Sequence, residues 1–352
     1  MVGYAKSQIP NLKSQISSPQ MKVSVIVTVL NEGPAICRLL DSLAAQTRQP
    51  DEVVIVDGGS TDSTLTTLQN YADQDHLSLR ILVEPGANIS RGRNLAIAAA
   101  SGDVIASTDA GVWLAPEWLA ELVAPFESEN PPQVVAGFFV PDPQSVFEIA
   151  MGATALPVLA DIDPDRFLPS SRSVAFTRSA WEAAGGYPEW LDYCEDLIFD
   201  FRLRDLYQLF AFAPRAVAHF RPRSSLRSFF KQYYQYARGD GKADLWRKRH
   251  AIRYLTYLVA APLLLILGWH VSPWWWFLGI GLAAVGLFAK PYRRLWPILH
   301  TIDWGQRLRA ILWVPVIRVA GDLAKMLGYP IGWLWRIRHL PRQPELQWRS
   351  PH

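Results

Sequence analysis

The chain has 352 residues, with 35 Lys and Arg against 32 Asp and Glu and a formal net charge of +3 at pH 7. A balance so close to neutral excludes a protein that binds nucleic acid through bulk positive charge. The two cysteines, Cys37 and Cys194, provide no disulfide framework and fit a reducing compartment. Residues 1–21 are polar and lack the apolar core of a signal peptide, so we expect a flexible tail there.

Four continuous apolar runs predict buried β-strands. They are Val23–Leu30, Val53–Val56, Leu79–Val83 and Val104–Thr108. Helical patterns separate them, beginning near Pro34, after Ser60-Thr61-Asp62 and at Ser90, which we expect to cap its helix. Strands that alternate with helices predict an α/β fold with a doubly wound, mostly parallel sheet.

Two of these strands end at an acid, Asp57 and Asp109. Open α/β sheets bind their ligands at the carboxyl ends of their strands. Gly58 and Gly59 follow Asp57 and allow a ligand to approach the backbone closely. A carboxylate in this place can accept hydrogen bonds from a ribose or a base, so both acids are candidate binding residues.

A second acidic pair, Glu195 and Asp196, follows a turn at residues 184–188. Adjacent acids at the start of a helix are also favoured by the helix dipole alone, so the local pattern leaves a capping role open. Further along, Gln232–Gly241 combines aromatic and basic residues directly before a long apolar region. By itself that stretch would suit a surface that binds lipid headgroups.

Two apolar runs, Ile252–Trp269 and Pro273–Ala289, predict a hairpin of membrane-spanning helices over about 252–289. The second run opens with three tryptophans, which favour the membrane interface. The alternative is a helical hairpin buried in a soluble core. Lys and Arg flank the pair on its outer sides and are absent from the His270–Ser272 connection. The positive-inside rule then predicts a multi-pass protein of the plasma (inner) membrane with a cytoplasmic α/β part.

A third apolar segment, about 311–335, carries Arg318, Asp322 and Lys325 near its middle. Charges at the centre of a spanning helix cost several kcal/mol. We therefore expect an interfacial or re-entrant helix, with a third membrane crossing as the alternative.

The ordered motifs resemble the family 2 glycosyltransferases of the membrane-bound bacterial type, which have the GT-A fold. They read VIVTVLNEG, VDGGSTDST, SRGRNLAIAAASGD, TDAG, GGYPE, CED and YARGDG. The resemblance covers Lys22–Lys242 and implies a GT-A domain over residues 22–245. The membrane region over 246–352 is similar to that of members acting on lipid-linked or polysaccharide acceptors.

The resemblance assigns roles to residues that match the family's motifs. The donor-binding positions are Asn31, Glu32, Asp57, Arg93, Asn94, Asp109 and Arg238. Asp196 matches the catalytic base, and Glu195 is a supporting or capping residue. Asp109 matches the first acid of a metal-binding Asp-x-Asp motif, so the resemblance implies Mg²⁺ or Mn²⁺.

Two departures from the family pattern stand out. Gly58 occupies the place of a second acid in the first turn, and Gly111 replaces the second acid of the metal motif. A metal would therefore need a ligand from elsewhere, and His219 is the best candidate.

The resemblance implies an inverting glycosyltransferase, hexosyltransferase-like, that uses a UDP- or GDP-linked sugar. The acceptor would be a hydroxyl of a lipid-linked, polysaccharide or other membrane-proximal molecule of the cell envelope, with no nucleic-acid partner. Three alternatives stay open: a polyprenyl-phosphate sugar synthase of the same family, a nucleotidyltransferase, and a non-catalytic membrane scaffold. Asn31–Pro34 lacks the basic Gly-rich loop of a nucleotidyltransferase, whereas Gly58 and Gly111 motivate the scaffold.

Overall fold

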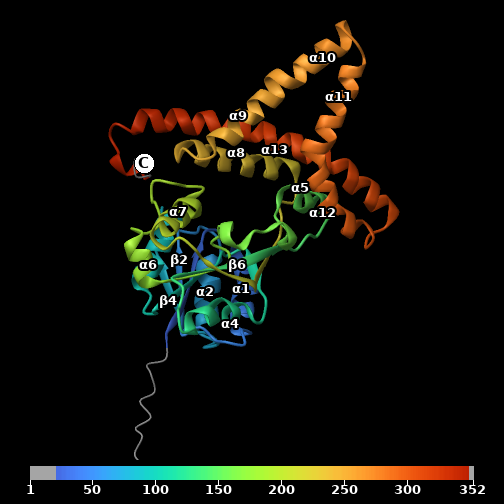
Figure 1. Cartoon of the computed structure of the whole chain (residues 1–352). Coiled ribbons are helices and arrows are strands. Elements are labelled where there is room, and N and C mark those ends of the chain that lie inside the picture. The colour runs from blue at the N-terminus through green and yellow to red at the C-terminus, as the bar shows by residue number, and fades with distance from the viewer. Residues whose placement is uncertain (1–20, 349–352) are drawn as a thin grey trace, which may run out of the picture.

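A computed structural model of the chain describes residues 21–348. The predicted tail over residues 1–21 lies outside this range, apart from Met21. The α/β part forms one end of the molecule, and a set of long helices covers the other (Figure 1).

Eight strands form one sheet in the order β3-β2-β1-β4-β7-β6-β8-β5. Their bounds are β1 (Val23–Val29), β2 (Glu52–Asp57), β3 (Leu79–Val83), β4 (Val104–Ser107), β5 (Val112–Leu114), β6 (Val134–Pro141), β7 (Val174–Thr177) and β8 (Ala211–Phe220). The first four strands in chain order pair in parallel, as predicted. Beyond β4 the sheet is mixed, because β7 runs antiparallel to both β4 and β6.

Helices cover both faces of the sheet, which explains why its strands are apolar on both sides. The bounds are α1 (Ile36–Ala44), α2 (Thr64–Ala72), α3 (Ile89–Ala99), α4 (Trp118–Val123), α6 (Arg178–Ala183) and α7 (Glu195–Tyr207). Val25 of β1 belongs to the core cluster that contains Leu39 of α1, whereas its neighbour Ile26 belongs to the cluster that contains Ile97 of α3. This two-sided burial confirms the doubly wound prediction.

The start of α3 differs from the prediction by two residues. Asn88, not Ser90, is the N-cap, because its extended backbone lets Oδ1 accept a hydrogen bond from the Arg91 N–H at 2.9 Å. Ser90 lies within the first turn, where its hydroxyl donates to the Leu191 carbonyl at 3.3 Å.

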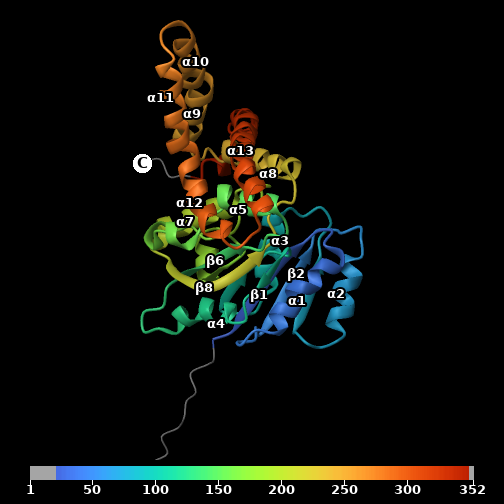
Figure 2. The same cartoon turned by 90° about the vertical axis from the view of Figure 1, so that its right-hand side faces the viewer.

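A layer of helices covers the carboxyl side of the sheet (Figure 2). It comprises α5 (Val146–Ala155), α8 (Leu226–Lys242), α12 (Ala289–Leu299) and α13 (Trp304–His339). The long helix α13 packs along α8 so closely that a Cβ at Gly328 or Gly332 would collide with the α8 backbone. Glycine at these two positions therefore permits the close approach of the two helices.

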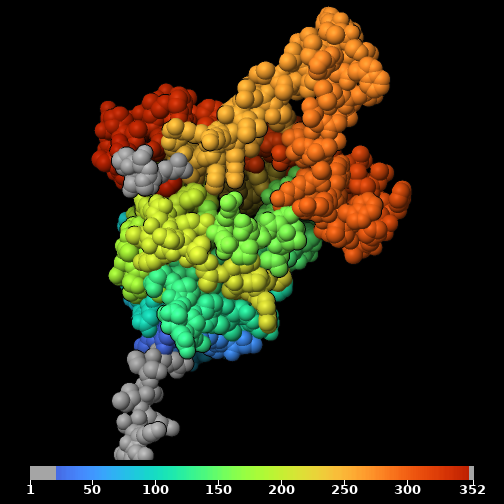
Figure 3. Space-filling model, viewed as in Figure 1, coloured from blue at the N-terminus to red at the C-terminus, as the bar shows by residue number. Residues whose placement is uncertain are grey.

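The predicted hairpin is present as two continuous helical stretches, Arg247–His270 and Trp274–Leu299. The first contains α9 (Arg247–Leu255) and α10 (Ala261–His270), and the second contains α11 (Trp274–Ala283) and α12. Only 6% of the most apolar window of each stretch is buried. In the space-filling view the hairpin projects beyond the rest of the molecule (Figure 3). The alternative of a hairpin buried in a soluble core is therefore wrong.

The third apolar segment belongs to α13, one helix of 36 residues that runs without a reversal. Its Asp322 is 3% exposed and accepts hydrogen bonds from Arg253 at 2.7 Å and from Tyr257 at 3.0 Å. Arg318 lies 3.2 Å from the same carboxylate. The charge of Asp322 is thus buried and paired within the protein. A continuous helix fits the interfacial alternative and not the re-entrant one, and its position in a membrane stays a prediction.

Candidate active site

The turns that follow β1 and β2 are tied together by polar side chains. Asn31 has a left-handed backbone (φ 56°), and its Oδ1 accepts a hydrogen bond from the Thr61 N–H at 2.9 Å. Asp57 is 1% exposed, and its Oδ1 accepts hydrogen bonds from the Ser60 N–H at 2.9 Å and the Ser60 hydroxyl at 2.7 Å. Asp57 therefore has a structural task in this turn, and its contact with a base or ribose stays a prediction.

Arg93 holds the centre of the site together. Its guanidinium is 3% exposed and donates to Glu195 Oε1 at 2.6 Å and to Asp109 Oδ1 at 2.9 Å. The other oxygen of Asp109 faces Arg172 Nε at 3.4 Å. These ion pairs bring together residues of α3, α7, the end of β4 and the segment before β7. The structure thus joins three of the predicted residues, Arg93, Asp109 and Glu195.

The acidic pair Glu195 and Asp196 begins α7, as predicted. Cys194 precedes it in the left-handed conformation (φ 65°), and Glu195 and Asp196 occupy the first turn. Burial raises the pKa of Asp196 above the usual aspartate range, and the Arg93 charge opposes that rise. Burial and the adjacent Asp196 also raise the pKa of Glu195. A buried carboxylate with a raised pKa beside the guanidinium groups of Arg93 and Arg172 is suited to accept a proton.

Sequence reasoning missed two residues of this cluster. Asp200 lies one turn beyond Asp196, is 3% exposed, and its Oδ2 has no hydrogen-bond partner within residues 21–348. Burial raises the pKa of Asp200 well above its ordinary value. The i, i+4 spacing of Asp196 and Asp200 was a visible signal. Arg172 belongs to no motif, and only the packing of its segment brings it to Asp109.

Asn94 and Arg238 lie beside the site, and both side chains form hydrogen bonds with other parts of the protein. The Asn94 side chain donates to the Tyr187 carbonyl and Glu189, and accepts from the Trp181 indole and the Tyr187 N–H. All four hydrogen-bonding positions of this amide are thus in use. Arg238 donates to Asp192 at 3.3 Å, close to the turn before Glu195 and Asp196. Contacts of both residues with a donor stay predictions.

The structure does not bring His219 and Asp109 into contact. The pairing of β5 with β8 sets His219 opposite Trp113, and the two rings stack at 3.8 Å. Burial lowers the pKa of His219, and the charges that act on it are those of Asp142 and Arg38. Within residues 21–348, no three His, Cys, Asp or Glu side chains gather as a ready-made metal site.

The negative charge of Asp109 acts on Glu32, in the turn after β1. Burial raises the pKa of Glu32, followed by the negative charges of Asp109 and Asp62. The Asp109 side chain is 26% exposed. The turn after β1 and the end of β4 therefore bring two carboxylates, Glu32 and Asp109, within electrostatic range of each other.

Comparison with known proteins shows which family the N-terminal part of the chain matches. Residues 24–166 match the family described as glycosyl transferase family 2. The chain carries a family 2 glycosyltransferase domain. The match covers β1 to α5 and includes Asp57, Arg93 and Asp109, but not Asp196.

Curated relatives match part of this chain over part of their own length. Validoxylamine A glucosyltransferase of Streptomyces hygroscopicus subsp. limoneus is 31% identical over 117 residues, 33% of this chain and 26% of that protein. Glucosyl-dolichyl phosphate glucuronosyltransferase of Haloferax volcanii is 31% identical over 124 residues, 35% of this chain and 39% of that protein. The aligned segments thus span well under half of either relative.

A solved structure shows the same fold over most of the chain. Mannosyltransferase PcManGT of Pyrobaculum calidifontis, in complex with GDP-Man and Mn²⁺, covers 87% of this chain and 87% of its own, with a TM-score of 0.53 and 20% identity. This likeness confirms the predicted GT-A-type fold of the family 2 domain.

Proposed function

We propose that the protein is an inverting glycosyltransferase that moves a sugar from a nucleotide-sugar donor to a hydroxyl group at the membrane surface. The observation that carries this proposal is Arg93, buried between Asp109 and Glu195 with Asp196 adjacent. It combines a positive charge suited to a diphosphate with a carboxylate suited to a proton.

Asp196 is the proposed base. It takes the proton of the acceptor hydroxyl while the hydroxyl oxygen bonds to the anomeric carbon of the sugar. The bond between that carbon and the donor's phosphate oxygen breaks, and its electron pair leaves with the nucleoside diphosphate. One base and direct attack from the opposite side invert the anomeric configuration, and proton removal makes the poor nucleophile reactive.

The leaving diphosphate needs positive charge. Arg93 and Arg172 both lie at Asp109, so their guanidinium groups are the proposed partners of the phosphate oxygens. A UDP- or GDP-linked donor fits this proposal, and GDP-Man is the ligand of the structurally similar mannosyltransferase.

The residues present fit a divalent cation of the Mg²⁺ or Mn²⁺ type. Asp109 and Glu32 supply hard carboxylate oxygen ligands, which such ions prefer. These two residues would hold the ion together with the donor; His219 stacks on Trp113 out of contact with Asp109, so it is not part of this proposed ligand set. When bound, the ion would neutralise charge that develops on the leaving diphosphate.

We further propose that the hairpin spans the plasma (inner) membrane twice, with the family 2 domain in the cytoplasm and α13 along the membrane surface. Support comes from two exposed apolar stretches of 24 and 26 residues. The Haloferax relative is named for a lipid-linked substrate, glucosyl-dolichyl phosphate. An acceptor that is lipid-linked or emerges from the membrane suits this arrangement, and a polyprenyl-phosphate sugar synthase is the alternative within it.

Sugar transfer by the purified, detergent-solubilised chain tests the function. A panel of labelled UDP and GDP sugars is offered with lipid and glycan acceptors, and NMR reports the anomeric configuration of the product. Asp196→Asn should cut turnover by ~10²-fold or more and leave donor affinity nearly intact. Glu195→Gln should be milder, and Asp205→Asn on the exposed side of the same helix is the matched control.

Three other results would contradict parts of this proposal. Near-normal turnover of Asp196→Asn would refute the base. A retained anomeric configuration would refute direct inversion. Absence of transfer from every donor would favour the non-catalytic scaffold.

A further inference from the structure

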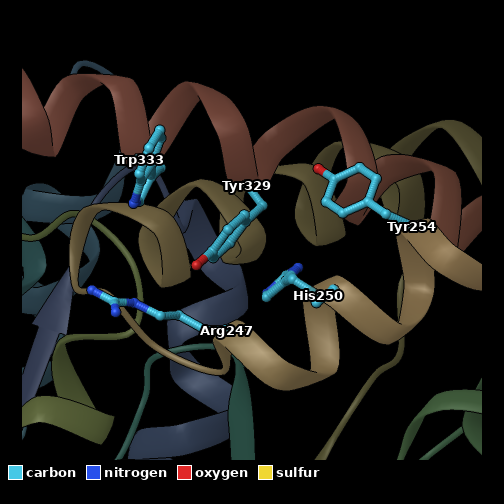
Figure 4. Close-up of a pocket in the computed structure, with 6 residues that line it drawn as sticks. Arg247, His250, Tyr254, Tyr329 and Trp333 are labelled. Atoms are coloured by element: carbon cyan, nitrogen blue, oxygen red, sulfur yellow. The ribbon is translucent and has the colours of Figure 1, made fainter.

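A hollow outside the active site lies between α9 and the second half of α13. It has a volume of about 380 Å³, within the roughly 300–1,000 Å³ range of ligand pockets. Its walls are Arg247, His250, Ala251 and Tyr254 from α9, and Tyr329 and Trp333 from α13 (Figure 4).

Three hydrogen-bond donors of this hollow have capacity to spare. Arg247 uses Nε and Nη2 on Asp244, which leaves Nη1. Neither the Tyr329 hydroxyl nor the Trp333 indole N–H donates a hydrogen bond to another of residues 21–348. Figure 4 shows the Trp333 nitrogen and the Tyr329 oxygen turned toward the side of the hollow where the Arg247 guanidinium lies.

The acceptors near these donors are already engaged. Asp244 is neutralised by Arg247 in a bidentate ion pair. The His250 ring contacts Asp240 through Nε2 at 3.2 Å and Arg253 through Nδ1 at 3.1 Å, and it stacks on Tyr329 at 3.8 Å. Together, the free Nη1 of Arg247, the Tyr329 hydroxyl and the Trp333 indole N–H offer three donors to an anion such as phosphate.

The surroundings identify where such an anion would come from. Arg247, Lys248 and Arg249 are consecutive exposed cations at the start of the first apolar stretch. On α13, Ile331, Leu334 and Ile337 are about half exposed. Cations and a tryptophan at the end of a spanning helix, beside exposed apolar side chains, match the headgroup level of a bilayer.

We propose that this hollow binds the phosphate group of a membrane lipid, separately from the donor site. The inference rests on the proposed membrane hairpin. Because the hollow joins α9 to α13, an occupied site would hold the base of the hairpin against the helix that packs on α8. Asp240 of α8 contacts both His250 and Cys194, so the same junction borders the turn before the catalytic pair.

Native mass spectrometry of the full chain in neutral detergent tests the proposal. The probes are short-chain phosphatidylglycerol, a short polyprenyl monophosphate, phosphatidylcholine and inorganic phosphate. Tyr329→Phe combined with Trp333→Phe removes two donors while keeping the rings that pack against His250 and α9. We expect this double variant to bind the phosphatidylglycerol or polyprenyl phosphate at least tenfold more weakly.

Tyr254→Phe is the matched control, because it lies in the same hollow but its hydroxyl already donates to the Met326 carbonyl at 2.7 Å. Its lipid affinity should equal that of the unaltered chain. Preference for phosphatidylglycerol would identify a bulk anionic lipid, and preference for the polyprenyl phosphate would identify an acceptor-type lipid. Equal binding by the double variant and the unaltered chain, or binding of inorganic phosphate without gain from the lipid chains, would overturn the proposal.

Sugar transfer measured on the same preparations separates this inference from the proposed function. Lipid binding that depends on Tyr329 and Trp333 would support the lipid site even if the protein transferred sugar from none of the nucleotide-sugar donors. Conversely, normal sugar transfer together with lipid binding that the Tyr329→Phe, Trp333→Phe double variant retains in full would leave the enzyme assignment intact and refute the lipid site.

Discussion

Replacement of Arg93 by Gln tests whether one guanidinium neutralises the buried acids of the site. Arg93 is 3% exposed and bonds both Glu195 and Asp109, and Glu195 is itself 7% exposed. Removal of one partner of a buried ion pair costs about 3–5 kcal/mol, because the remaining charge is left uncompensated. For a chain of this size we expect the unfolding midpoint to fall by on the order of 10 °C.

Thermal unfolding in detergent measures this shift against a matched control. Arg91 lies on the same helix, is 48% exposed, and pairs with Glu84 at the surface. A surface pair contributes about 0–1 kcal/mol, so Arg91→Gln should move the midpoint by no more than a few degrees. Adding Glu195→Gln to Arg93→Gln should recover part of the lost stability, because a neutral amide needs no cation.

Arg93→Gln should also alter the pH dependence of turnover. The Arg93 charge lowers the pKa of Asp196 against the effect of burial, so its loss raises that pKa further. Asp196 acts as a base only when deprotonated, and the acid limb of the pH–rate profile should therefore move to higher pH. Equal midpoints for Arg93→Gln and Arg91→Gln, or a double variant less stable than Arg93→Gln, would refute the neutralising role.

Three further predictions follow from other parts of the molecule. Chelation with EDTA should abolish transfer, and Mg²⁺ or Mn²⁺ should restore it; full activity in EDTA would give Asp109 a role without metal. A cysteine at Ser272 should react with an impermeant thiol reagent on intact cells and one at Ser350 should not, whereas labelling at Ser350 would show that α13 crosses the membrane. Gly332→Ala should lower the unfolding midpoint, because its Cβ meets a carbonyl oxygen of α8, while Gly281→Ala has open space and should not; equal midpoints would contradict the close packing of α8 and α13.

The sequence alone determined the elements whose signals are local. Apolar runs that end at Asp57 and Asp109 predicted parallel strands with acids at one edge, because strand burial and turn chemistry are written within a few residues. The two long apolar stretches predicted the hairpin for the same reason. The order of the motifs was enough to predict the GT-A-type fold.

Tertiary structure decided which charges meet. Arg172 reaches Asp109 only because β7 pairs antiparallel with β4, and His219 is kept from Asp109 because β8 sets it against Trp113. Asp322 is an acidic residue within an apolar segment of α13. Arg253 of α9, which lies 69 residues away in the sequence, neutralises it. Ion pairs depend on distances of a few ångström between segments remote in sequence, and no local pattern encodes such distances.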